Sequence, residues 1–180
     1  MFETFFENSN QISFYDLKGK SNAKSLQLQI EYNYSNLLNL NLVYKNYDVR
    51  QDYISGYLQK PLLAKNRFFV NLGIESKLNP SKKKFRLDIT YNLIGSQRLV
   101  ETLRDKSNSF SPSYSLWNSQ ITKTFSKKIQ IYMGSENIGN YNQSNPIIGI
   151  EDPFSTNFDA SQIYAPIFGG MIYLGIRINS

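Results

Sequence analysis

"SLQLQIEYNY", residues Ser25 to Tyr34, is the stretch of sequence that decides the fold. Its apolar side chains all have one parity and its polar side chains have the other. The first set is Leu26, Leu28, Ile30, Tyr32 and Tyr34, and the second set is Gln27, Gln29, Glu31 and Asn33. A period of two is that of an extended strand, whose successive side chains point to opposite faces. The stretch therefore predicts a strand with one apolar face, which can meet a protein core or lipid.

Further segments of the chain repeat this alternation and predict further strands. Their apolar parities run through Leu40 to Tyr44, Phe68 to Ile74, Phe85 to Leu93, Trp117 to Phe125, Ile129 to Met133 and Ile172 to Ile178. A segment from about Phe2 to Leu17 is a candidate for one more strand, although its alternation is broken. Helical periodicity competes strongly nowhere. We therefore expect an all-β fold of about eight strands.

The connections between these strands alternate between short and long. The short ones are Ser35 to Leu37, Asn79 to Lys84 and Ser126 to Lys128, and the long ones run from about Asn46 to Lys65, Gly95 to Ser113 and Gly139 to Pro166. In an up-and-down meander, every second connection falls at the same end of the sheet. Outer-membrane barrels have tight turns at one end and extended loops at the other. Structureless loops of about 20 residues are uncommon in a compact soluble domain.

Strand length and polar composition favour the same interpretation. Strands of about 10–12 residues, tilted near 45°, match the apolar band of roughly 25 Å on a membrane barrel, whereas soluble strands more often have about 5–6 residues. The polar parity consists mostly of Asn, Gln, Ser and Thr, as suits a lumen, and aromatic residues gather near strand ends. We predict an antiparallel up-and-down meander of about eight strands that is part of a transmembrane β-barrel, or a small version of one.

Composition removes the usual parts of most enzymes. The 180 residues include no cysteine and no histidine. Thiol nucleophiles, disulfides, imidazole metal ligands and the commonest general base are therefore missing. We expect no enzymatic activity, no catalytic residue, no cofactor and no metal site. The sequence also contains no run of roughly 18 apolar residues that would form a transmembrane helix.

The net charge of +6 comes partly from lysines at the short turns. These lysines are Lys82, Lys83, Lys84, Lys127 and Lys128. Proteins that bind single-stranded nucleic acid interleave basic and aromatic residues along one face, and this chain does not. We therefore predict no nucleic-acid partner. Solvated turn lysines that also meet anionic headgroups are the simpler interpretation.

The last long connection contains the candidate site residues for a cation or a substrate. They are Glu151, Asp152 and Asp159. Loop acids in water, with prolines shaping the turns, are the simpler interpretation. The block "NPIIGIEDPF", Asn145 to Phe154, is expected to pack this loop over the barrel mouth. Asn and Gln on the polar parity are expected to satisfy one another and water, or alternatively to touch a ligand or a plug. No ligand-binding residue is assigned.

Four segments carry a resemblance to a known family. They are "FYDLKGKSNAKSLQLQIEYNY" (Phe14 to Tyr34), "KPLLAKNRFFVNLGIES" (Lys60 to Ser76), "SPSYSLWNSQITKTFSKKIQIYMGSENIGN" (Ser111 to Asn140) and "NPIIGIEDPFSTNFDASQIYAPIFGGMIYLGIRI" (Asn145 to Ile178). These segments resemble the C-terminal barrel strands of TonB-dependent outer-membrane receptors, especially the Bacteroidetes type. The resemblance spans nearly the whole chain.

The resemblance implies a transport role in the cell outer membrane. Receptors of this family are active transporters with a barrel of about 22 strands, a plug domain and an inner-membrane energy partner. Residues 1–180 would then be a C-terminal β-barrel segment with the plug domain absent. The implied partners are outer-membrane lipid, the remaining barrel strands and plug of the parent receptor, and the TonB complex only through the missing N-terminal part. The nutrient would be an iron chelate, cobalamin, glycan or peptide.

The two ends of the chain depart from the family pattern. The start, "MFETFFENSNQ", lacks the basic residues and apolar run of a signal peptide. The last strand ends in "LGIRINS", without the terminal aromatic that the family usually carries there. A truncated or split receptor is therefore expected.

Two alternatives from other classes remain open. One is a self-sufficient small outer-membrane barrel with a structural or adhesive role. The other is a soluble β-barrel that binds an apolar ligand, with its apolar parity turned inward. An isolated chain is expected either as an open curved sheet or as a small closed barrel filled by its own side chains. In a membrane, side chains such as Leu26, Leu28, Leu174 and Ile176 would point outward against hydrocarbon.

Overall fold

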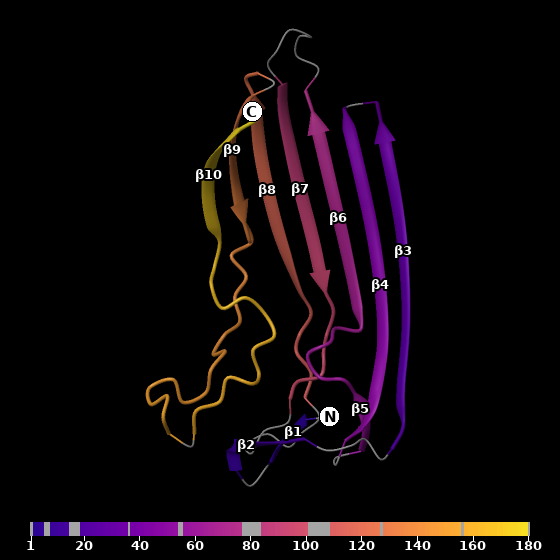
Figure 1. The fold of residues 1–180 in the computed structure, drawn as a ribbon, viewed down its shortest axis with the longest axis vertical. Helices are drawn as coiled ribbons and strands as arrows, with labels where there is room; N and C mark the ends of the chain where they lie inside the picture. The colour runs from indigo at the N-terminus through magenta and orange to yellow at the C-terminus, as the bar shows by residue number, and fades with distance from the viewer. Residues whose placement is uncertain are drawn as a thin grey trace.

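The computed structural model consists of strands and loops (Figure 1). It describes residues 2–5, 8–14, 19–35, 37–53, 56–76, 84–100, 109–126, 128–155 and 157–179. The strands are β1 (Phe2–Phe5), β2 (Asn8–Phe14), β3 (Ser21–Tyr34), β4 (Leu38–Tyr53), β5 (Gly56–Gln59), β6 (Asn66–Glu75), β7 (Lys84–Ile94), β8 (Tyr114–Thr124), β9 (Ile129–Glu136) and β10 (Met171–Ile178). The all-β prediction is confirmed. In this described part, no helix has the length and apolarity needed to cross a membrane.

The long strands form one antiparallel sheet in chain order. Seven strands follow one another as β3-β4-β6-β7-β8-β9-β10, and every neighbouring pair is antiparallel. The short β5 is the eighth strand of this sheet. It pairs with Arg50–Tyr53 of β4, whereas β6 pairs with Leu38–Asn46 of the same strand. The predicted up-and-down meander of about eight strands is therefore confirmed.

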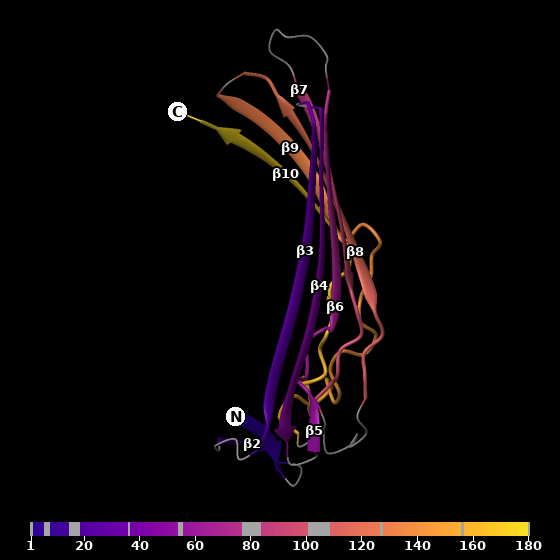
Figure 2. The ribbon, with the colours of Figure 1, turned by 90° about the vertical axis from the view of Figure 1, so that its right-hand side faces the viewer.

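The sheet is open, and β3 and β10 are its edges. Among the residues that the structure describes, β3 pairs with β4 alone and β10 pairs with β9 alone. Figure 2 shows β9 and β10 curving away from the plane of β3 and β4. Of the two forms expected for an isolated chain, the structure has the open curved sheet.

The N-terminal segment is not a strand of this sheet, which corrects the prediction for Phe2 to Leu17. Instead β1 and β2 form a separate two-stranded sheet at the long-loop end (Figure 1). Residues 15–18 lie outside the described residues. The broken alternation gives the reason, because a segment without a regular period of two has no continuous apolar side to match the neighbouring strand.

Short turns and long loops lie at opposite ends of the sheet, as predicted (Figure 1). The connection from Gly95 to Ser113 has the predicted bounds, since β7 ends at Ile94 and β8 begins at Tyr114. The connection predicted from Asn46 to Lys65 is wrong in its first half. There β4 continues to Tyr53, and β5 pairs with it. The strand was missed because its polar and apolar sides exchange near Asn46.

Few side chains are buried, because the described part of the chain places no second layer over the sheet. The buried apolar residues are Ala64, Ile94, Leu99 and Ala165, all small or at the long-loop end. No large described side chain is fully buried. A soluble domain normally packs two layers around a hydrophobic core. Backbone hydrogen bonds between strands, rather than a packed core, define this sheet.

Candidate functional site

The strand register joins the apolar parities of the seven long strands into one face. Residues paired across antiparallel strands lie on the same side of a sheet. One such row crosses all seven strands: Tyr32, Leu40, Leu72, Ile89, Ser119, Ser135 and Ile172. We call this side of the sheet the apolar face and the opposite side the polar face. The register therefore extends the alternation seen in Ser25 to Tyr34 across the sheet.

The side chains of the apolar face are exposed. Ile30 is 63% exposed on β3, Ile121 is 48% exposed on the inner strand β8, and Ile172 is 75% exposed on β10. Single exposed apolar residues are normal on soluble proteins, but large contiguous patches mark a binding surface or contact with a membrane. The apolar face is such a patch, because it spans every long strand of the sheet.

The apolar face ends part-way along β3 and β4. On β4, the parity of Leu38 to Tyr44 continues toward the long loops with polar residues: Asn46, Asp48, Arg50 and Asp52. The other side of β4 becomes apolar at the same level, with Tyr47, Val49 and Tyr53. On β3 the apolar stretch runs from Leu26 to Tyr34, which has the length of about 9–11 residues that a tilted strand needs to cross a bilayer. On β3 and β4 the apolar face therefore stops before the long loops, and the same side of both strands continues with polar residues.

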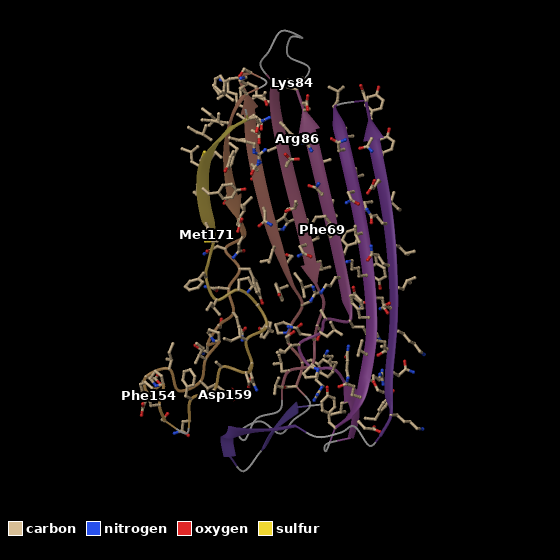
Figure 3. All side chains as sticks on the ribbon, in the orientation of Figure 1. Phe69, Lys84, Arg86, Phe154, Asp159 and Met171 are labelled. Atoms are coloured by element: carbon tan, nitrogen blue, oxygen red, sulfur yellow. The ribbon has the colours of Figure 1, made fainter. Side chains whose placement is uncertain are left out.

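The polar face is the concave side of the sheet. One hollow on it is lined by residues from five neighbouring strands, β6 to β10, among them Lys84, Arg86, Gln120 and Arg177. A second hollow lies nearer the long loops and is lined by Val43, Lys45, Tyr47, Arg67, Phe69 and Asn92. Figure 3 shows Lys84, Arg86 and Phe69 on β6 and β7. Both hollows belong to the face that would be the lumen side of a barrel.

Polar side chains on this face bond to one another. The Arg86 guanidinium pairs with the Asp88 carboxylate, 2.8 Å between Nη2 and Oδ1, and Nη1 donates to Asn39 Oδ1 at 3.3 Å. Asn39 Nδ2 in turn donates to Asn33 Oδ1 at 2.6 Å. Lys84 forms an ion pair with Glu75, with Nζ 2.6 Å from Oε1. The prediction that polar-parity amides satisfy one another is confirmed for Asn33 and Asn39.

Two tyrosines lie over two glycines where β10 meets β9. The register pairs Tyr132 with Gly175 and Tyr173 with Gly134. A Cβ atom at either glycine would collide with the facing ring. The two rings meet edge to face with centroids 6.3 Å apart, and the Tyr173 hydroxyl donates to Gln120 Oε1 at 3.1 Å. These contacts attach β10 to β9 and also to β8.

We expect Gly134→Ala to loosen β10 by about 1–3 kcal/mol, because the added methyl group overpacks the contact with the Tyr173 ring. Tyr173→Phe removes only the hydroxyl and its hydrogen bond, so a loss of about 0.5–1.5 kcal/mol is expected. Amide hydrogen exchange of Ile172–Ile178 in detergent micelles measures both effects. Equal exchange in Gly134→Ala and the parent chain would show that the glycine is not needed.

The long loops pack on one another at the far end of the sheet. Gln143 is only 8% exposed, and its Oε1 accepts the backbone N–H groups of Tyr164 and Ala165 at 2.9 and 3.3 Å. Its Nε2 donates to the Gln162 carbonyl oxygen at 3.0 Å. One side chain therefore joins the outgoing and returning halves of the last loop.

Arg98 connects two other loops at the same end of the sheet. It is 3% exposed, and its Nε donates to the Gln59 carbonyl oxygen at 2.7 Å. Its guanidinium lies 4.9 Å from the centre of the Tyr53 ring.

Burial raises the pKa of Tyr164, and the neighbouring Tyr141 acts in the same direction. We call the packed loops around Arg98, Gln143 and Tyr164 the loop layer.

No protein-family model, curated protein or solved structure matches the chain. The two faces, the open edges and the loop layer are therefore the structural basis for any proposal about function.

The loop acids predicted as a candidate cation or substrate site act in turns. Asp152 Oδ1 accepts the Phe154 N–H at 3.3 Å. Asp159 Oδ1 accepts both the N–H and the hydroxyl of Ser161, at 2.8 and 2.6 Å. Glu151 is exposed. Among the described residues no three acids gather at a site that could hold a metal ion. Asp152 and Asp159 therefore have turn contacts, as the simpler interpretation expects.

The block from Asn145 to Phe154 does not pack as predicted. Phe154 is 99% exposed and Ile150 is also exposed. Figure 3 shows Phe154 far from the sheet, on the last loop. Only part of the block is held, since Ile148 exchanges backbone hydrogen bonds with Asp159. The prediction failed because the apolar residues of this block have no described partner segment against which to pack.

Of the turn lysines, Lys84 and Lys128 are in the described part, whereas Lys82, Lys83 and Lys127 are outside it. Lys128 is exposed, and Lys84 is paired with Glu75. The sequence analysis missed the contacts of Lys123, which lies on the apolar face near the short turns. Its Nζ is 4.8 Å and 5.1 Å from the ring centres of Phe125 and Phe85. The sequence shows only a lysine beside Phe125 on the apolar parity, and the contact with Phe85 follows from the register of β7 and β8.

Proposed function

We propose that the chain forms part of the wall of a transmembrane β-barrel in the cell outer membrane. The observation that carries this proposal is the exposed apolar face, which the register continues through all seven long strands. Apolar surface left in water is unfavourable by about 25 cal/mol per Å². Hydrocarbon removes that penalty, and the band from Leu26 to Tyr34 has a suitable length for it.

The opposite side of the sheet supports the same proposal. A barrel lumen is polar, and the concave face has paired charges and mutually bonded amides. The separation of short turns from long loops also suits an outer-membrane barrel, whose turns face the periplasm and whose loops face outward. In this arrangement the loop layer lies on the outer side.

At a finer level, we propose that the chain is the C-terminal barrel portion of a TonB-dependent receptor. This part rests on the sequence resemblance alone. The chain would contribute wall and outer loops to the path of a nutrient such as an iron chelate, cobalamin, glycan or peptide. Transport would need the remaining strands, the plug domain and, through the N-terminal part, the TonB complex. We also propose that the chain has no enzymatic activity.

Two observations count against the other candidate functions. A soluble barrel that binds an apolar ligand would turn its apolar parity inward, whereas Ile30, Ile121 and Ile172 of that parity are exposed along the sheet. A self-sufficient small barrel would need β3 to meet β10, and these strands are the two open edges of the described sheet.

Single-cysteine labels test the membrane proposal, because the chain has no cysteine of its own. Ile121→Cys and Thr122→Cys place a label on opposite faces of β8. After reconstitution into vesicles with brominated acyl chains, we expect strong quenching of a fluorophore at position 121. The neighbouring position 122 is the matched control and should be quenched much less. Similar quenching at both positions, or stronger quenching at 122, would contradict the proposal.

The DNA upstream of the Met1 codon tests the finer proposal. We expect it to encode a signal peptide, a plug domain and further barrel strands in the same or an adjacent reading frame. Genome sequencing across this region gives the answer directly. A stand-alone gene with its own export signal would instead support the small self-sufficient barrel.

A further inference from the structure

The two edges of the sheet run in the same direction. The order β3-β4-β6-β7-β8-β9-β10 has seven strands and therefore six antiparallel pairings. Each pairing reverses the direction once, so six reversals leave β10 parallel to β3. Figure 1 shows both arrows pointing toward the short-turn end. Joining β3 directly to β10 would therefore create a parallel junction in an otherwise antiparallel sheet.

Copies of the same chain do not remove this mismatch. A second copy related by rotation about the barrel axis would place its β10 parallel to β3 of the first copy. An inverted copy could pair β3 with β3 antiparallel, but its long loops would then lie on the opposite side of the membrane. Outer-membrane barrels keep their short turns on the periplasmic side. Neither arrangement is therefore compatible with an all-antiparallel barrel inserted from one side.

Both edge strands also lack proline, and their pairings with β4 and β9 show no register shift. Natural edge strands are blunted by proline, bulges, charged residues or short length. The β3 strand is also long, with 14 residues. The apolar face continues to this edge at Ile30 and to the other edge at Ile172 on β10. Both edges are therefore open templates for a strand with the same alternation.

From these observations we infer that the chain is completed by a β-sheet segment outside its 180 residues that supplies an odd number of membrane-crossing strands. This inference rests on the proposed membrane barrel and specifies its partner. The two outer strands of the partner run opposite to β3 and β10. They carry apolar residues on the lipid side and polar residues on the lumen side, because the apolar and polar faces both continue to the edges.

The first experiment asks whether the full chain closes by itself in vesicles. Leu28→Cys with Leu174→Cys puts one cysteine on each edge, and a short bis-maleimide reports their proximity. Leu40→Cys with Leu72→Cys is the matched control, because these residues are paired neighbours in β4 and β6. We expect an intrachain cross-link in the control and none between the edges. An intrachain cross-link between positions 28 and 174 would overturn the inference.

The same reagents test pairing between copies. A dimer linked through positions 28 and 174 would indicate rotated copies, and a dimer linked through two cysteines at position 28 would indicate inverted copies. Either dimer would overturn the inference. These outcomes differ from failure of the membrane proposal, which the labels at positions 121 and 122 detect. Strong quenching at position 121 and weak quenching at position 122, together with a cross-link between the two edges, would reject only the odd-strand partner.

The second experiment identifies the partner strand in membranes of producing cells. Photoreactive residues replace Leu26 and Tyr32 on β3 in separate variants, and the cross-linked peptides are sequenced. We expect both positions to reach one segment outside the 180 residues, with its residue numbers in reverse order relative to β3. The same order would mean a parallel neighbour and would overturn the inference. Capture of lipid alone at both positions would also overturn it.

Discussion

Replacement of Leu72 by arginine is expected to weaken insertion into lipid vesicles by about 2–4 kcal/mol, the cost of an arginine near the middle of the lipid-facing side of a barrel. Leu72 is on β6, an inner strand of the sheet, paired with Leu40 on one side and Ile89 on the other. Its side chain lies within the apolar face, far from the polar ends of the band. Flotation of the vesicle-bound chain at increasing urea concentration measures the change in partition free energy.

Asn71→Arg is the matched control for this prediction. Asn71 precedes Leu72 on the same strand, and its side chain lies on the polar face beside Asn41 and Thr90. An arginine there meets a polar surface, so we expect a loss below about 1 kcal/mol. An equal loss in the two variants would mean that the two faces have similar surroundings. A larger loss for Asn71→Arg would mean that the polar face meets the lipid.

The sheet was predictable from the sequence because two independent patterns agree. Alternation identified the seven long strands, and alternating loop lengths identified their order as a meander. The extension of β4 to Tyr53 escaped because the polarity of its two sides exchanges after Tyr44. Where β4 leaves the sheet of long strands and reaches the loop layer, the surroundings of both its sides change at once. Alternation persists through such a point, but the apolar parity does not.

The contacts of the site were less predictable, because they depend on register. A shift of one residue between β9 and β10 would place every side chain on the other face. The tyrosine–glycine contacts need the observed register, in which Tyr132 faces Gly175 and Tyr173 faces Gly134. The sequence does contain a signal, since both strands carry Tyr-x-Gly. Two such motifs on neighbouring antiparallel strands can place each tyrosine over the other strand's glycine.

The open edges were equally invisible in the sequence. A strand at the edge of this sheet and a strand in its middle have the same alternation, because each has one apolar face and one polar face. The strands of Ser21–Tyr34 and Met171–Ile178 therefore look like interior barrel strands. Only the pairing shows that each has one neighbour in the described sheet.

The largest effect in the loop layer is expected for Gln143→Ala, which should favour local opening of the last loop by about 2–4 kcal/mol. The substitution leaves two backbone N–H groups, those of Tyr164 and Ala165, and the Gln162 carbonyl without the amide partner. A buried polar group that loses its hydrogen bond costs about 1–3 kcal/mol. Limited proteolysis and amide exchange at Tyr164 and Ala165 measure the opening.

Two further variants separate the hydrogen bonds of Gln143 from general effects on the loop. Gln143→Glu keeps an acceptor for Tyr164 and Ala165 but turns a buried carboxylate toward the Gln162 carbonyl oxygen, so an opening at least as large is expected at neutral pH. Asn142→Ala alters the exposed neighbouring residue and should leave proteolysis unchanged. Because the strands are held by their own backbone hydrogen bonds, exchange in β6 and β7 should be the same in every variant. Faster exchange throughout the sheet would show that Gln143 supports the sheet and not only the loop layer.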